Sequence, residues 1–175
     1  MQTKEYQALF LRKALVDAVE ANHIWPVYAC CEAALESNWG RSKLATGANN
    51  LFGQKQGQKV TLPYPTVDWN TTEVKTGAST LELATWLKFP DWITCFRERM
   101  ALLRRVRFSL YDPALRAQSG EEFVREVSGY TDEHGTYHSR WATDPLRAEK
   151  VLNIHRRHKE FLDSIIPLIL PSHPR

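Results

Sequence analysis

The chain of 175 residues is long enough for one domain with a hydrophobic core, and its 43% hydrophobic and 25% charged residues are ordinary for a globular protein. It has no run of roughly 18 apolar residues that could span a membrane, and its charged N-terminus lacks the apolar centre of a secretory signal. The net charge of +3 is mildly basic, but the basic clusters have no interleaved aromatic residues, so we expect no nucleic-acid partner.

Two helices are predicted at the start of the chain. The first runs from about Lys4 to Ala21. The second begins at Pro26, which suits a first helical turn, and ends before Gly40. The apolar positions expected to face the core are Tyr6, Leu9, Phe10, Ala14, Ala18 and Val19 in the first helix and Val27, Cys31, Ala34 and Leu35 in the second.

The pattern changes at about 59–89, where apolar and polar residues alternate on both sides of a turn at Thr76-Gly77-Ala78. This alternation is typical of strands and predicts a small antiparallel lobe inserted after the second helix. Asp91 can cap the next helix, and the last helix is predicted over about 144–166, before a Pro-containing tail at 167–175. The chain is therefore predicted to be a single domain, 1–175, of the mainly α (α+β) class.

Glu36 ends the second helix on a carboxylate. It shares a helix face with Ala29, Glu32 and Ala33, and the small alanine side chains would let a ligand or another chain come close. The negative end of the helix dipole, the like charge of Glu32 and partial burial all favour the protonated form of Glu36. A general acid needs such a proton, although an ordinary surface glutamate would occupy the same position.

A loop rich in aromatic, amide and glycine residues follows Glu36. Aromatic faces and side-chain amides suit acetamido sugars, although asparagine and glycine are also ordinary turn residues. Glycosidic hydrolysis usually needs a second carboxylate across the bond. Glu73 is the best placed of Asp68, Glu73, Glu82, Asp91 and Glu98, because it shares a predicted strand face with Trp69 and Thr71, but an exposed strand-end glutamate fits the pattern equally well.

Four segments of the chain resemble a known family. They are AALESNWGRSKLA, NNLFGQK, NTTEV and WATDPLRAEKV, which occur in this order over about Ala29 to Leu152. These segments are similar to those of the glucosaminidase family of peptidoglycan hydrolases (glycoside hydrolase family 73), which includes flagellar rod-associated domains, autolysins and phage endolysins. The resemblance implies a lysozyme-like helical lobe, a small β-hairpin lobe and a cleft between them.

The resemblance also implies roles for particular residues. Glu36 matches the catalytic acid of the family, and Glu73 matches the second carboxylate on the hairpin. The other positions carried over are expected to bind substrate or shape the cleft; they are Trp39, Asn50, Phe52, Gly53, Glu98, Tyr130 and Trp141.

Four features depart from the family pattern. Glu32 stands where glutamine is usual, and Gln54 replaces a common isoleucine. Arg147 replaces a common tyrosine, which weakens the expectation of one sugar contact. The segment 131–140 looks like an inserted loop that could reshape one end of the cleft.

Other chemistries have little support. His134 and His138, with two acids beside them, lack a third histidine or a cysteine nearby, so we expect no metal, and we expect no cofactor. Cys30, Cys31 and Cys95 occupy apolar helix positions, which predicts buried free thiols rather than a nucleophile.

The sequence therefore predicts an endo-acting peptidoglycan hydrolase that cleaves the β-1,4 bond between N-acetylglucosamine and N-acetylmuramic acid, with Glu36 as general acid. Glu73 would activate water or stabilise the oxocarbenium-like centre, unless the acetamido group of the substrate acts instead. A muramidase or lytic transglycosylase and a non-catalytic wall-binding module remain open as alternatives. We expect a monomer without a signal peptide, made in the cytoplasm, that reaches the wall by phage-type release or special export.

Overall fold

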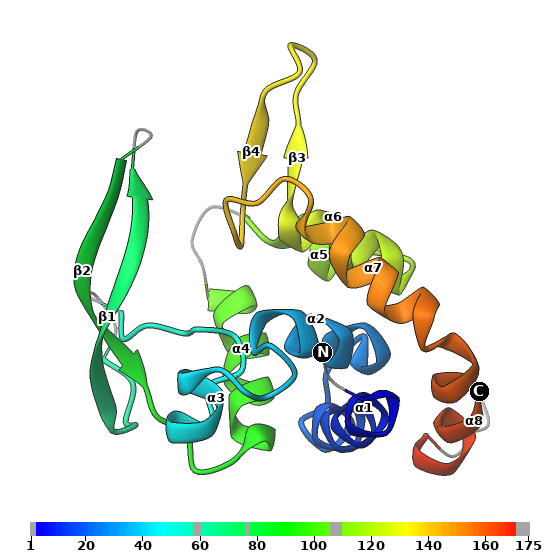
Figure 1. The fold of residues 1–175 in the computed structure, drawn as a ribbon. Coiled ribbons are helices and arrows are strands. Elements are labelled where there is room, and N and C mark those ends of the chain that lie inside the picture. The colour runs from blue at the N-terminus through cyan, green and yellow to red at the C-terminus, as the bar shows by residue number, and fades with distance from the viewer. Residues whose placement is uncertain (1–2, 58–60, 76–77, 106–109, 171–175) are drawn as a thin grey trace.

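A computed structural model describes residues 3–57, 61–75, 78–105 and 110–170, with the side chains of 71–82 outside the description. Helices form the body, and two hairpins project from it on the same side (Figure 1). The prediction of a mainly α domain with a small antiparallel lobe is confirmed. The elements are α1 (Lys4–Glu20), α2 (Pro26–Glu36), α3 (Lys43–Ala48), β1 (Thr66–Lys75), β2 (Ala78–Leu87), α4 (Trp92–Arg105), α5 (Asp112–Leu115), α6 (Gly120–Ser128), β3 (Gly129–Thr131), β4 (Tyr137–Ser139), α7 (Arg147–Arg157) and α8 (Lys159–Ile169).

Helices α1 and α2 pack together in the hydrophobic core, and α4 and α8 also contact α1. The predicted apolar stripe of α1 is partly wrong, because Leu9 is 68% exposed whereas Leu11 and Leu15 are fully buried. Either set of positions can form a stripe at helical spacing. The choice between them depends on where the neighbouring helices lie, which the local pattern does not contain.

The first hairpin is the predicted antiparallel lobe. Strand β1 pairs with β2 from Thr66 opposite Leu87 onwards, and the predicted turn residues Thr76 and Gly77 lie outside the described part of the chain. At its base, the Leu87 N–H donates to the Gln54 carbonyl at 3.0 Å. The loop after α3 therefore holds the base of this hairpin on the helical body.

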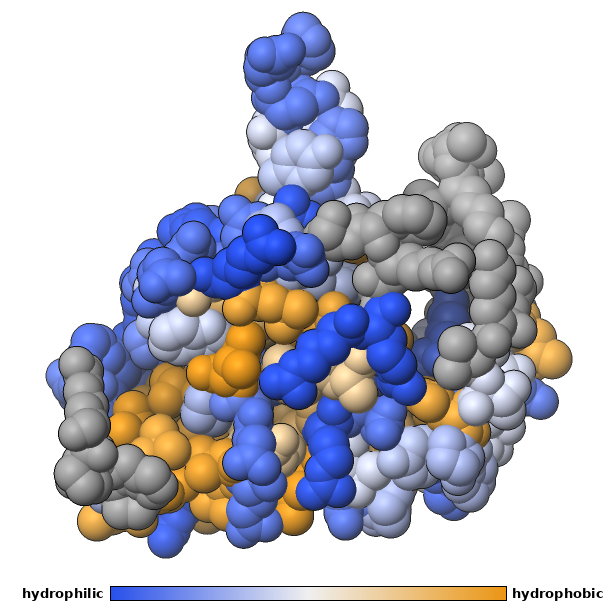
Figure 2. Space-filling view, turned by 180° about the vertical axis from the view of Figure 1, so that it is seen from behind, coloured by the Kyte–Doolittle hydropathy of each residue, from blue (hydrophilic) through white to orange (hydrophobic). Residues whose placement is uncertain are grey.

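The segment 131–140, predicted as a loop, contributes most of a second hairpin. Strands β3 and β4 are antiparallel. Asp132 organises the turn, because its carboxylate accepts the N–H groups of His134 and Thr136 and lies 2.7 Å from Nε2 of His138. Strands of three residues are too short to show alternation in the sequence. The hairpin extends well beyond the body and is hydrophilic along its length (Figure 2).

The single C-terminal helix of the prediction is two helices in the structure. The break lies at His158, between α7 and α8. The predicted end before Pro167 is also wrong, because α8 continues through this residue to Ile169. Pro167 has no N–H to donate to the carbonyl four residues earlier, and α8 ends only two residues after it.

The prediction of buried free thiols is confirmed for Cys30, Cys31 and Cys95. Burial raises the pKa of the Cys95 thiol to about 12, so this side chain stays neutral and acts as a packing group. The helices of the described part of the chain include none that is long and apolar enough to cross a membrane.

His23 is a buried titratable side chain in the turn between α1 and α2. Its Nδ1 accepts the Trp25 N–H at 3.1 Å, and its ring packs edge-on against Phe96 and Phe123. Burial, with a smaller effect of the Arg99 charge, lowers the pKa of His23 to about 3. In the unfolded chain a histidine titrates near pH 6.5, so between these values the unfolded state binds a proton that the folded state does not.

We therefore predict that the free energy of unfolding falls by about 2 kcal/mol between pH 7 and pH 5 through His23 alone. His23→Gln should lose this part of the pH dependence, since glutamine does not titrate. Urea unfolding of both proteins at the two pH values measures the difference. An equal loss of stability in the wild type and the variant would contradict the prediction.

Candidate active site

Glu36 is the last residue of α2, and its side chain is 22% exposed. The chain then turns sharply, with left-handed backbone conformations at Asn38, Trp39 and Gly40. The Ser37 hydroxyl stabilises this turn by accepting the Gly40 N–H at 2.7 Å. The helix thus ends with the Glu36 carboxyl group partly open to solvent.

Glu36 belongs to a group of four charged side chains, here called the charge cluster. Arg147 of α7 donates from Nε to Oε1 of Glu36 at 2.6 Å and from Nη2 to Oε1 of Glu32 at 2.8 Å. Arg99 of α4 donates from Nη2 to both carboxylate oxygens of Glu32, at 2.9 and 3.0 Å. The side chains of Glu32, Arg99 and Arg147 are at most 2% exposed, so Glu36 is the member that solvent reaches.

Glu32 and the arginines around it hold one another in their charged forms. Burial acts to raise the pKa of the Glu32 carboxyl, but Arg99 and Arg147 outweigh it and hold this pKa below its usual value. Burial likewise acts to lower the pKa of Arg147, and Glu32 and Glu36 raise it above its ordinary value. The like charge that the sequence places beside Glu36 is therefore neutralised by two arginines.

The helix face that carries the two acids is covered, whereas the sequence analysis left it open to a ligand or another chain. Ala29 and Ala33 are fully buried, and α7 packs on α2. These small side chains permit the close approach that brings Arg147 to Glu36, across 111 positions of sequence.

A hollow of about 310 Å³ forms the second part of the site, here called the aromatic hollow. Three residues predicted to bind substrate, Phe52, Gly53 and Trp141, line it together. Gly53 has φ +63°, a left-handed conformation that glycine adopts without strain, so glycine is favoured at this turn. The full lining is Phe52, Gly53, Gln54, Lys55, Leu102, Tyr111 and Trp141.

Arg99 connects the aromatic hollow with the charge cluster. Its guanidinium carbon lies 3.9 Å from the ring centroid of Trp141 and 4.6 Å from that of Phe52. The same group holds Glu32, so the position of both rings depends on the buried ion pair. Arg99 was not identified from the sequence, and neither were three residues that line the aromatic hollow, Lys55, Leu102 and Tyr111. The sequence contained one signal for Arg99, namely the two acids Glu32 and Glu36 on an otherwise apolar helix. A buried carboxylate needs a cation close to it, so an arginine from another helix was to be expected.

Asn50 shapes the loop that carries Phe52 and Gly53. It is 1% exposed, and its Nδ2 donates to the carbonyls of Gln54 at 2.8 Å and Leu87 at 2.9 Å. Its Oδ1 accepts the Gln54 N–H at 2.9 Å. The amide group is thus satisfied by the protein backbone, which supports the cleft-shaping part of its predicted role.

The other predicted residues lie outside the lining of the aromatic hollow. Trp39 packs its ring against Phe10, with centroids 6.0 Å apart. Glu98 accepts the Tyr64 hydroxyl at 3.1 Å, and Tyr130 is 48% exposed on β3. Their contact with substrate stays a prediction.

Glu73 lies on β1 with its backbone opposite Thr80, close to the tip of the hairpin. Its side chain is outside the described part of the structure, so its distance from Glu36 and its role as second carboxylate stay predictions.

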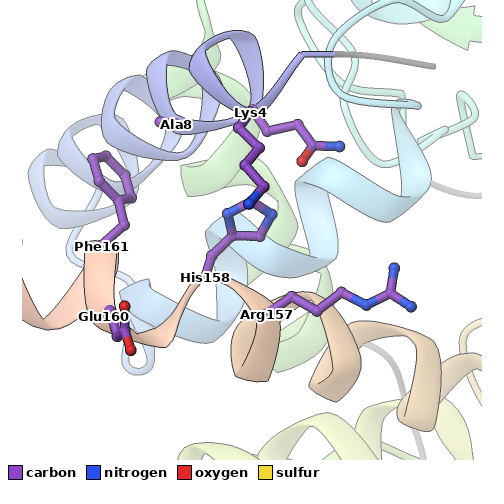
Figure 3. A pocket seen from close by; sticks show the side chains of 7 residues that line it. Lys4, Ala8, Arg157, His158, Glu160 and Phe161 are labelled. Atoms are coloured by element: carbon purple, nitrogen blue, oxygen red, sulfur yellow. The ribbon is translucent and has the colours of Figure 1, made fainter.

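A larger hollow of about 570 Å³ lies between α1 and the start of α8 (Figure 3). Lys4 and His158 point toward one another in this view, and the lining also includes Arg157 and Glu160, which is the one acid among its described lining residues. It contains no predicted site residue. Its size alone does not make it the candidate active site, because neither Glu36 nor any residue of the aromatic hollow lines it.

The fold defines the class of protein. The structure resembles the catalytic domain of the autolysin Auto from Listeria monocytogenes, with a TM-score of 0.72 and 23% identity over 92% of this chain and 90% of that chain. It also resembles the glycoside hydrolase domain of FlgJ from Salmonella typhimurium, with a TM-score of 0.63 and 23% identity over 88% of this chain and 98% of that chain. The mainly α, lysozyme-like architecture is thereby confirmed.

Residues 12–160 match the glucosaminidase family, described as mannosyl-glycoprotein endo-beta-N-acetylglucosaminidase, and the chain belongs to this family. A relative in Bacillus subtilis, the exo-glucosaminidase LytG, is 31% identical in a match of 147 aligned positions that covers 79% of this chain and 46% of that protein. An autolysin of Enterococcus faecalis is 27% identical over 77% of this chain and 17% of that protein. The chain thus spans less than half the length of both relatives.

Asn50→Ala is predicted to lower the free energy of unfolding by about 3 kcal/mol, because it leaves buried backbone groups of Gln54 and Leu87 without partners. Denaturant unfolding measures this change. Asn70→Ala, an exposed substitution on β1, is the control and should change stability by less than about 0.5 kcal/mol. A loss at Asn50 no larger than that of the control would contradict the structural role.

Proposed function

We propose that this domain is an endo-acting peptidoglycan hydrolase that cleaves the β-1,4 bond between N-acetylglucosamine and N-acetylmuramic acid. The observation that carries the proposal is the partly exposed carboxyl group of Glu36, anchored by Arg147 through one oxygen. Membership of the glucosaminidase family supports the glycan substrate.

Glu36 acts as the general acid in this proposal. Arg147 occupies Oε1, and within the described part of the chain no hydrogen bond reaches Oε2. Oε2 can therefore carry the proton to the glycosidic oxygen, which leaves as a hydroxyl group while positive charge develops on the sugar ring. Glu73 activates water or stabilises that charge, unless the acetamido group of the substrate takes this part.

The aromatic hollow binds sugar rings in this proposal. Trp141 is partly exposed in this hollow, with the buried Phe52 packed beside it, and an aromatic face can stack on the apolar C–H groups of a sugar ring. The domain acts as a monomer on glycan strands of the bacterial wall, which it reaches by release or export from the cytoplasm.

Glu36→Gln is predicted to lower the rate of peptidoglycan digestion by about 10²–10⁴-fold, because an amide cannot donate the acid proton. The measurement is mass spectrometry of digests reduced with borohydride, with reduced N-acetylglucosamine ends expected from the wild type. Glu20→Gln, at the exposed end of α1, is the matched control and should keep full activity. Full activity of Glu36→Gln would refute the assignment.

The same digests test the alternatives. Reduced N-acetylmuramic acid ends indicate a muramidase, and anhydro ends indicate a lytic transglycosylase. Large early fragments indicate endo-action, whereas small products alone from the start indicate exo-action, as the name of the Bacillus subtilis relative implies for that protein. Binding to the wall without any product indicates a non-catalytic module.

Glu73→Gln separates the two routes for the second step. If Glu73 activates water, the variant should lose activity about as severely as Glu36→Gln, by about 10²-fold or more. If the acetamido group acts, the loss should be much smaller. The measurement is the initial rate of digestion on the same wall preparation, with folding verified by circular dichroism.

A further inference from the structure

Arg147 is nearly inaccessible, yet it contacts the one solvent-reachable acid of the charge cluster. Resting on the proposed role of Glu36, we propose that Arg147 is a positioning residue that orients Glu36 for proton transfer and stabilises the carboxylate left when the proton has gone. A buried ion pair is weak evidence for a stabilising role, because the loss of hydration offsets much of its attraction. The geometry indicates instead that Arg147 acts on the Glu36 carboxyl group.

The guanidinium group of Arg147 is held by three different partners. Nε donates to Glu36 Oε1 at 2.6 Å, Nη1 donates to Ser128 Oγ at 2.9 Å, and Nη2 donates to Glu32 Oε1 at 2.8 Å. These bonds come from α2 and α6, so the planar group cannot rotate without breaking one of them. The orientation of its Nε–H, and hence of the Glu36 carboxyl, is fixed before substrate arrives.

Two departures from the family pattern form one contact in the structure. Glu32 stands where glutamine is usual, and Arg147 stands where tyrosine is usual. Here they are an ion pair of 2.8 Å. Arg99 supplies the second cation that Glu32 needs, so Arg147 can serve both acids. The structure therefore replaces the expectation of a weakened sugar contact with a contact to the acid itself.

The charge balance of the cluster favours the proton transfer. With Glu36 protonated, two arginines face the single carboxylate of Glu32. In the transfer the Oε2–H bond of Glu36 breaks, a new O–H bond forms on the leaving oxygen, and the electrons of the broken glycosidic bond go to that oxygen. Glu36 is then ionised, and the cluster has equal numbers of positive and negative charges. The Nε–H of Arg147 already faces Oε1 of Glu36, so it stabilises the negative charge that develops on Glu36 during the transfer.

The test compares Arg147→Met and Arg147→Lys with the wild type in kcat and KM on soluble glycan fragments of peptidoglycan. Arg147→Met should lower kcat by about 10- to 100-fold while KM changes by less than about threefold, because the loss falls on orientation and the transition state. Arg147→Lys should recover part of kcat, because it keeps the charge without the three-point contact. In both variants Glu32 keeps its two bonds from Arg99, so folded protein is expected.

Asp17→Asn is the matched control, since it breaks the ion pair between Lys13 and Asp17 on α1 and should leave kcat within about twofold of the wild type. A kcat of Arg147→Met within the same twofold range would overturn the proposal. So would an equal loss in Asp17→Asn, because it would indicate a general effect of weakened packing.

A second measurement does not depend on activity. Carbodiimide-driven coupling of an amine to Glu36, followed by peptide mass spectrometry, should be several-fold faster in Arg147→Met, because the carboxyl group loses its partner. An unchanged rate would overturn the contact between Arg147 and Glu36. Wild-type protein that digests no glycan would refute the proposed function, whereas active wild type with fully active Arg147→Met would refute this inference alone.

Discussion

The burial of the Glu32 carboxylate is the constraint on which the site depends. A charge taken out of water needs opposite charge and hydrogen bonds at close range, and Arg99 and Arg147 supply both. Three helices, α2, α4 and α7, must therefore meet at one point. The proposed functional residues are attached to this arrangement: Glu36 accepts the Nε–H of Arg147, and the Trp141 ring lies over Arg99.

A second constraint acts through backbone hydrogen bonds. Asn50 ties the loop of Phe52 and Gly53 to the end of β2, where Leu87 supplies a carbonyl. The base of the β1–β2 hairpin and one wall of the aromatic hollow are thus a single unit. This coupling means that a hairpin bearing Glu73 is anchored beside the residues that we assign to sugar binding.

Much of the fold follows from local signals. Pro26 at the start of α2 and the alternation along β1 and β2 act over a few residues, and the structure agrees with them. Asp91 accepts the Thr94 N–H at 2.7 Å, as predicted for a cap of α4. The wrong predictions concern residues whose burial depends on helices distant in the sequence. Leu9 and Leu11 both suit a helical stripe, and only packing by neighbouring helices decides that Leu11 is the buried one.

The sequence by itself determined the family, the helix that ends on Glu36 and the residues of the loop around Phe52, because contiguous motifs and short periodicities encode them. Only the tertiary structure decided that Glu32 is buried, that Arg147 binds Glu36 and that Arg99 supports Trp141. The physical reason is that a charged side chain is recognisable by type in a sequence, whereas its partner is chosen by the packing of helices more than one hundred residues apart.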